Sequence, residues 1–266
     1  MSTLGSLRQG YETNGHALAT NVLRHTDLDI LQKELEVLVD SLNRNTAPME
    51  ERSSYKKAFI QITNLWQRSE IVKTFVFRKD LAKLAADIMG VSGVRLYHDQ
   101  ALFKEAGGGP TPWHVDQVYW PMDTPNTCTL WIPLQDTSLE MGPLAFASGS
   151  HVREDGRNLV ISDESQEYFE QWVSKQDLSI HEEAVKKGDL TLHAGWTVHK
   201  AGPNHTKLRR EVMTIIYMAD DACLLDPLSA TQKVDRHVFT PGIAPGAPID
   251  SGLNPLLYSA EVVDEF

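Results

Sequence analysis

The stretch TPWHVDQVYWP (residues 111–121) contains a histidine and an aspartate with one residue between them, and it directly follows a glycine-rich tract. Alternate residues of a β-strand face the same side. If a strand starts here, His114 and Asp116 present an imidazole and a carboxylate to one point. These are two of the side chains that bind transition metals, so the pair is a candidate for half of a metal site.

The spacing alone is weak evidence, because His25 and Asp27 are separated in the same way. The second pair begins an amphipathic stretch, where we expect Thr26 to cap a helix and Asp27 to interact with the helix dipole. The pair at His114 differs because it follows a flexible tract on a predicted strand, a frequent setting for functional residues.

A metal requires a third ligand, and His199 is the strongest candidate. It lies in GDLTLHAGWTVHKAGPNHT, where a strand pattern resumes just before a Gly-Pro-Asn turn. His193 is the rival, although the Ala-Gly turn after it favours a packing role at a strand end. Two histidines and one carboxylate leave coordination positions open, as in non-haem Fe(II) oxygenases, whereas a structural zinc has four protein ligands.

Two adjacent arginines follow in RREVMTIIYM. A 2-oxo acid chelates iron through its keto oxygen and the nearby carboxylate, and its distal carboxylate then needs a cation. The planar guanidinium binds a carboxylate with two hydrogen bonds. Because neighbours on a strand face opposite ways, only one of Arg209 and Arg210 can point inward.

The remaining pattern predicts helices first and strands later. Helical spacing covers residues 26–45, with Leu28, Ile30, Leu31, Leu35, Leu38 and Leu42 as its apolar stripe, and shorter helices are expected at 69–77, 80–90 and 164–175. Short β-rich runs occupy residues 94–104, 127–135, 142–151, 188–195 and 210–220, and the tail from residue 240 reads as a wrapped loop. This order predicts a β-sandwich or jelly roll with helices packed on one side.

Composition narrows the class of protein. The net charge of -11 and pI of about 5.3 argue against a nucleic-acid partner and against binding to an anionic membrane. Two cysteines are too few for a disulfide framework, and the first residues show no signal-peptide pattern. We therefore expect a cytoplasmic protein that acts on a small molecule. Its oligomeric state does not follow from the sequence.

Three segments together resemble the phytanoyl-CoA dioxygenase family of Fe(II)/2-oxoglutarate-dependent oxygenases: PWHVDQVYWP, MGPLAFASGSH and the stretch from His199 to the arginines. The resemblance implies a mainly β fold with flanking helices and a double-stranded β-helix core of the jelly-roll or cupin-like kind. It also implies Fe(II) held by His114, Asp116 and His199, with 2-oxoglutarate and O2 as co-substrates.

The same resemblance assigns residues to 2-oxoglutarate. The family's arginine follows the second histidine at a separation that Arg210 matches, with Arg209 as the alternative. Positions corresponding to Gln100, Lys104 and Trp131 contact the co-substrate. The family further implies one dioxygenase domain over residues 1–266, with a helical part at about 1–92, the jelly-roll core at about 93–222 and a wrapped tail at 223–266.

The implied reaction is oxidation, most simply hydroxylation, of a small organic substrate with release of succinate and CO2. Acyl-CoA thioesters, amino acids and secondary metabolites all fit the family, although the acidic net charge disfavours a polyanionic CoA ester. Tyr119, Trp120 and Met122 are candidates for the substrate cavity. A zinc-dependent hydrolase and a non-catalytic jelly-roll binding protein are the alternatives, because either could carry the same His/Asp/His pattern.

Overall fold

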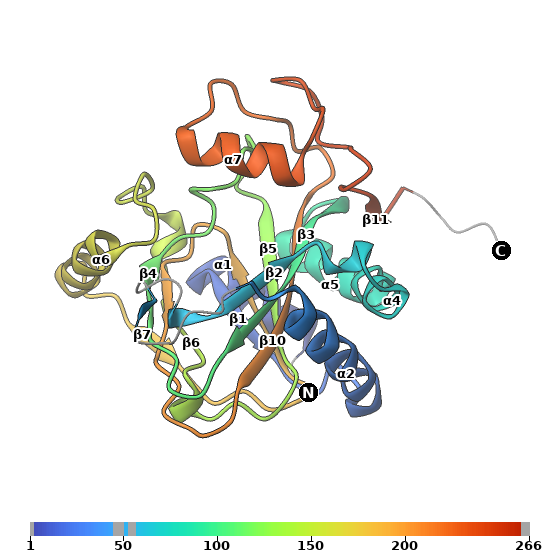
Figure 1. Ribbon diagram of the computed structural model, residues 1–266. Coiled ribbons are helices and arrows are strands. Elements are labelled where there is room, and N and C mark those ends of the chain that lie inside the picture. Colours follow the sequence, from blue (N-terminus) through green and yellow to red (C-terminus); the bar gives the residue numbers. More distant parts are fainter. Residues whose placement is uncertain (1–2, 45–50, 53–56, 262–266) are drawn as a thin grey trace.

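The structure is a computed structural model that describes residues 3–44, 51–52 and 57–261. Its strands form two antiparallel sheets (Figure 1). The larger sheet has the order β1 (His16–Ala19), β8 (Leu190–Ala194), β5 (Thr127–Pro133), β10 (Arg210–Ala219), β3 (Gly93–Lys104), β11 (Leu256–Ser259), and β2 (Ile60–Thr63) also pairs with β3. The smaller sheet has the order β4 (Thr111–His114), β9 (His199–Ala201), β6 (Leu144–Ala147), β7 (Ile180–Glu182). The predicted mainly β class is confirmed.

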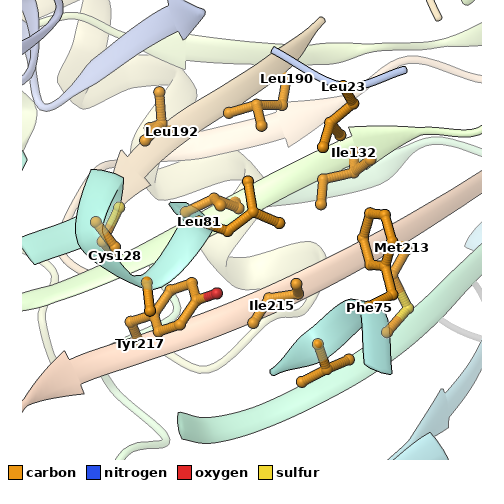
Figure 2. Close-up of a cluster of buried hydrophobic side chains, with 14 of the residues drawn as sticks. Leu23, Phe75, Leu81, Cys128, Ile132, Leu190, Leu192, Met213, Ile215 and Tyr217 are labelled. Carbon is orange, nitrogen blue, oxygen red and sulfur yellow. The ribbon is translucent and has the colours of Figure 1, made fainter. Parts of the chain in front are cut away.

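Helices from the N-terminal third cover one face of the larger sheet (Figure 1). They are α1 (Leu4–Asn14), α2 (His25–Leu42), α4 (Glu70–Val76) and α5 (Lys79–Met89). Figure 2 shows Phe75 and Leu81 of these helices among alternate side chains of the strands, namely Ile132, Leu190, Leu192, Met213, Ile215 and Tyr217. Since alternate strand residues face opposite sides, the intervening side chains of β5, β8 and β10 face away from this core.

Two further helices flank the rest of the molecule. α6 (Asp163–Lys175) packs against β4, where Trp113 and Val115 meet Phe169, Trp172 and Val173. α7 (Ala230–Phe239) lies at the end of the sheets shown uppermost in Figure 1. Short 3-10 turns at Leu65–Gln67, Leu139–Met141 and Ser150–Val152 complete the helical elements used below. Among the described residues, no helix is both long and apolar enough to span a membrane.

Most predicted elements are confirmed, including α4, whose N-cap is Ser69, and α5, which ends at Gly90 in the left-handed region. The predicted Thr26 cap is wrong. α2 starts at His25, two residues before the start that a Thr26 cap implies, and its N-cap Arg24 makes no side-chain capping bond. Ile30 from the predicted stripe is exposed. The buried stripe of α2 consists of Leu28, Leu31, Leu35 and Val39, so Val39 is buried although the predicted stripe did not include it.

The N-terminal and C-terminal parts also contain elements that were not predicted. β1 and β2 fall within the third that was read as helical, and each adds a short strand to the larger sheet. The tail is more than a loop, because it carries α7 and β11. Both short strands are completed by pairing with distant residues, so local pattern was insufficient to reveal them.

Gly142 lies near the start of β6, where it contacts Gly202 after β9 of the smaller sheet and Arg210 of the larger sheet. Its backbone has φ +69, and an added Cβ would collide with the carbonyl oxygen of Gly202, which precedes the Pro-Asn turn after β9. The carbonyl of Gly142 accepts a hydrogen bond from Arg210. This close approach therefore needs glycine both for its backbone conformation and for space.

We predict that Gly142→Ala lowers the free energy of unfolding by at least about 1 kcal/mol more than Gly149→Ala does, measured by urea denaturation. Gly149 is the matched control, because its φ is +79 but the nearest atom to an added Cβ, the Thr13 carbonyl oxygen, is 3.9 Å away. Both variants carry the backbone strain of about 1–2 kcal/mol, and only Gly142→Ala adds the collision. Equal losses in the two variants would contradict this explanation.

Candidate metal and co-substrate site

The structure brings His114, Asp116 and His199 together. Their potential ligand atoms all lie within 4.8 Å of one another, with Asp116 Oδ1 at 3.6 Å from His114 Nε2 and 3.8 Å from His199 Nε2. The expected geometry of one continuous strand is wrong, however. β4 ends at His114 and the chain then bends, so Asp116 reaches the cluster from the turn that follows.

Strand pairing supplies the third residue, since His114 of β4 is the antiparallel partner of His199 of β9. Both imidazoles are held through Nδ1: that of His114 donates to the Pro112 carbonyl at 2.7 Å, and that of His199 donates to the Thr197 carbonyl at 2.9 Å. A carbonyl only accepts, so Nδ1 carries the proton and the Nε2 of a neutral ring presents its lone pair. Backbone carbonyls orient metal-binding histidines in this way in many proteins.

Electrostatics favour ligand forms of these side chains. Burial lowers the pKa of His199 to about 3, which keeps the ring neutral. Burial alone would raise the pKa of Asp116, but the neighbouring histidines His199, His114 and His193 lower that pKa well below its usual range. The cluster therefore presents the unprotonated Nε2 of His199 and the carboxylate of Asp116 beside the Nε2 of His114, a set of ligand atoms that suits a divalent transition metal.

His193 lies beside the cluster but on the far side of the carboxylate. Its Nε2 is 3.3 Å from Asp116 Oδ2, whereas His114 and His199 approach Oδ1. Its ring is 2% exposed. We interpret this contact as a hydrogen bond that orients Asp116, which agrees with the expectation that His193 is not the third ligand.

A cavity of about 660 Å³ opens between the two sheets at this cluster. One wall comes from the smaller sheet and its flanking turn, including His114, Asp116 and His199. The opposite wall comes from the strand positions that face away from the helices, including Gln100, Thr129, Trp131, Arg210 and Thr214.

Arg210 is the first residue of β10 and lines the cavity. It is 2% exposed, and burial lowers its pKa to about 10, which still leaves it protonated at neutral pH. One guanidinium nitrogen donates to the Gly142 carbonyl, and the group lies 5.5 Å from the centre of the Trp131 ring. Among the described residues, no carboxylate forms an ion pair with it.

Arg209 points the other way, as strand alternation requires. Its guanidinium pairs with Asp40 at 2.7 Å and with Glu211 at 2.8 Å, and it covers the ring of Phe103. It is absent from the cavity wall. Of the two arginines, Arg210 faces the cavity and Arg209 faces away from it.

The three other residues assigned to 2-oxoglutarate differ in position. Gln100 and Trp131 line the cavity. Lys104 pairs with Arg210 across β3 and β10 but does not line the cavity. Its ammonium donates to the carbonyls of Gly109 at 2.6 Å and Gly202 at 2.9 Å, so it holds the loop behind the wall. Burial, with a contribution from Arg210, lowers the pKa of Lys104 to about 6.

Several buried polar atoms on the cavity wall lack a hydrogen-bond partner: Thr129 Oγ1, Trp131 Nε1, Arg210 Nε and Thr214 Oγ1. Buried polar groups are usually satisfied, and an unsatisfied group costs about 1–3 kcal/mol. Four such atoms on one wall, next to an unpaired guanidinium, fit a polar and negatively charged ligand. A 2-oxo dicarboxylate has this chemistry.

The contribution of α7 to the cavity was not predicted from the sequence. Thr231, Val234, Asp235, Val238 and Phe239 all line it. The pattern S-x-x-Q at Ser229 and Gln232 forms a capping box and could have revealed the helix. Of the three cavity candidates after Asp116, Tyr119 and Trp120 line the wall, whereas Met122 packs in a neighbouring apolar cluster.

The protein resembles known enzymes over most of its length. It is 27% identical over 201 residues, 73% of this chain and 69% of the relative, to a protein of Stutzerimonas stutzeri described as "Probable alpha-ketoglutarate-dependent hypophosphite dioxygenase". It is 25% identical over 161 residues to phytanoyl-CoA dioxygenase 1 of Oryza sativa subsp. japonica, covering 60% of this chain and 57% of the rice protein. The chain thus spans little more than half the length of that plant relative.

Among solved structures, the epimerase SnoN from nogalamycin biosynthesis, in complex with Fe3+, alpha ketoglutarate and nogalamycin RO, superimposes with a TM-score of 0.77. The match has 24% identity and covers 96% of this chain and 98% of that one. This likeness confirms the predicted jelly-roll fold. The sequence model of the phytanoyl-CoA dioxygenase (PhyH) family matches residues 11–212. The chain therefore belongs to the phytanoyl-CoA dioxygenase family of Fe(II)- and 2-oxoglutarate-dependent dioxygenases.

Proposed function

We propose that this protein, acting as a single dioxygenase domain, hydroxylates a carbon of a small organic substrate, with 2-oxoglutarate and O2 as co-substrates. The observation that carries the proposal is the buried guanidinium of Arg210, which has no carboxylate partner among the described residues and shares a cavity with His114, Asp116 and His199. A desolvated cation is costly unless an anion approaches it. A dicarboxylate that also reaches the metal cluster would meet that need.

His114, Asp116 and His199 would hold the iron through two Nε2 atoms and one carboxylate oxygen. When iron and 2-oxoglutarate are bound, they supply the oxidation of a substrate C–H bond by O2, with release of succinate and CO2. The protein contributes orientation: backbone carbonyls fix both imidazoles, and His193 holds the second oxygen of Asp116.

Arg210 would anchor the distal carboxylate of 2-oxoglutarate by a bidentate pair. Trp131 Nε1 and Thr214 Oγ1, both buried without a partner, are available to hydrogen-bond the same ligand, and Gln100 borders it. We assign Lys104 a supporting role, because its ammonium is engaged by loop carbonyls behind the wall. A zinc-dependent hydrolase needs no dicarboxylate co-substrate, so it would not explain why the guanidinium of Arg210 is buried in the cavity without an anionic partner among the described residues.

Asp116 also bears on the type of reaction. A halogenase of this chemistry must bind a halide at the metal, which requires a small residue where the carboxylate stands. Here the position is occupied by the carboxylate of Asp116, whose potential ligand atom lies within 4.8 Å of those of both histidines. Its negative charge opposes the binding of a halide nearby. We therefore expect oxygenation or another oxidation of carbon, with no halogenation by the unmodified protein.

For the metal, we predict that His199→Ala loses Fe(II) under conditions that saturate the unmodified protein. His193→Ala should retain binding with an affinity lowered by about 10–100-fold, because it removes only the hydrogen bond to a ligand. The measurement is anaerobic Fe(II) titration. Stoichiometric iron in His199→Ala together with its loss in His193→Ala would transfer the ligand role to His193.

For the co-substrate, we predict that Arg210→Ala weakens 2-oxoglutarate binding by well over tenfold, since loss of a buried charged partner costs about 2–5 kcal/mol. Arg209→Ala is the matched control. Its pairs with Asp40 and Glu211 lie outside the cavity, and the expected change is within about threefold. Anaerobic titration with 2-oxoglutarate measures both affinities, and the reverse ranking would assign the anchor to Arg209.

The function itself is tested by incubating the Fe(II) and 2-oxoglutarate complex with candidate metabolites without oxygen and then admitting O2. We predict that a true substrate stimulates succinate formation and gains one oxygen atom, detected by mass spectrometry. The His199→Ala variant is the control for metal-independent turnover. A chlorinated product in the presence of chloride, or hydrolysis without O2, would contradict the proposal.

A further inference from the structure

The part of the cavity that the co-substrate does not explain lies against α7. Thr231, Val234, Asp235 and Val238 line the cavity and recur at helical spacing, so one face of α7 turns toward it. Val234 is 64% exposed and Val238 is 40% exposed. An apolar helix face left open at a cavity is a surface that a ligand can cover.

Asp235 is the acidic group of this face. Its Oδ2 accepts a hydrogen bond from the Tyr97 hydroxyl at 3.2 Å, and Tyr97 is fully buried. That bond fixes the carboxyl group on the cavity wall. Burial, with a contribution from the charge of Asp116, raises the pKa of Asp235 to about 7 despite the bond from Tyr97. Among the described residues, no arginine or lysine forms an ion pair with it.

The charges around the cavity are unequal. Its described lining residues include two carboxylates, Asp116 and Asp235, but Arg210 is the one arginine or lysine among them. His98 also lines the wall, and burial lowers its pKa to about 4, so it is neutral at physiological pH. Once 2-oxoglutarate occupies Arg210, no described Arg or Lys on the wall can balance a second anion.

The rest of this region is apolar and aromatic. Phe59, Tyr119, Trp120, Ile161 and Phe239 line the cavity together with the two valines of α7. Phe239, the last residue of α7, stacks on the His98 ring with the ring centroids 4.1 Å apart. Both rings line the cavity. Such a lining favours the carbon skeleton of an organic molecule over a small, strongly hydrated ion.

We propose that Asp235 is a specificity-determining residue, and that the substrate is an uncharged or cationic molecule with an apolar body that donates a hydroxyl or amino hydrogen bond to Asp235. The same arrangement disfavours a substrate that places an anionic group beside Asp235. The inference rests on the proposed function, because it assigns Arg210 to 2-oxoglutarate.

The test uses three probes with one apolar body and different end groups: 4-phenylbutylamine, 4-phenylbutanol and 4-phenylbutyrate. Each is titrated calorimetrically, without oxygen, into protein saturated with Fe(II) and 2-oxoglutarate. We expect the amine and the alcohol to bind more tightly than the carboxylate, with the amine favoured over the carboxylate by at least about tenfold. Asp235→Asn, which keeps the size of the side chain, should lower that ratio by about tenfold.

Asp250→Asn is the matched control, because it removes one carboxylate from an exposed position outside the cavity and should leave the ratio unchanged. Equal binding of amine and carboxylate by the unmodified protein, an unchanged ratio in Asp235→Asn, or no binding of any probe would overturn the proposal. A separate titration with 2-oxoglutarate distinguishes failure of the proposed function from failure of the role assigned to Asp235. If 2-oxoglutarate does not bind, the proposed function fails; if it binds and the amine preference is absent, only the role of Asp235 fails.

Discussion

A guanidinium held inside a protein without a carboxylate partner is the constraint around which this molecule is arranged. Arg210 is buried and protonated, and within the described residues its guanidinium donates to the Gly142 carbonyl and pairs with no carboxylate. Its position follows from β10, where the alternate residues Met213, Ile215 and Tyr217 pack against the helices and thereby turn the other set toward the cavity. The apolar core and the polar wall are thus two faces of the same strands.

Opposite this cation, the turn after β4 contributes a carboxylate surrounded by histidines. Asp116 lies between histidines on both of its oxygens, and antiparallel pairing of β4 with β9 brings His114 against His199. A ligand that joins the two walls must therefore offer a carboxylate to Arg210 and metal-chelating atoms to the cluster. α7 completes the enclosure with an apolar face and one further acid, so the charge requirement differs between the two ends of the cavity.

Much of this arrangement could be predicted from the sequence, because strong local patterns encode it. The strand around Arg210 and the helix ending at Gly90 are examples, and alternation left only two choices for the inward arginine. What could not be predicted depends on distant contacts. The bend after His114 replaces a straight strand, β1 and β2 exist through pairing with β8 and β3, and the approach of Asp235 to Tyr97 joins residues far apart in the chain. A local sequence pattern does not specify contacts between residues that are far apart in the chain.

The central claim is that one cavity holds a metal at His114, Asp116 and His199 and a dicarboxylate at Arg210. A crystal structure of the protein grown without oxygen in the presence of Fe(II) and 2-oxoglutarate tests it most directly. The account predicts a single iron bound by those three side chains, chelated by 2-oxoglutarate whose distal carboxylate meets the guanidinium of Arg210. Iron bound by His193 in place of His199, or a distal carboxylate placed away from Arg210, would contradict it.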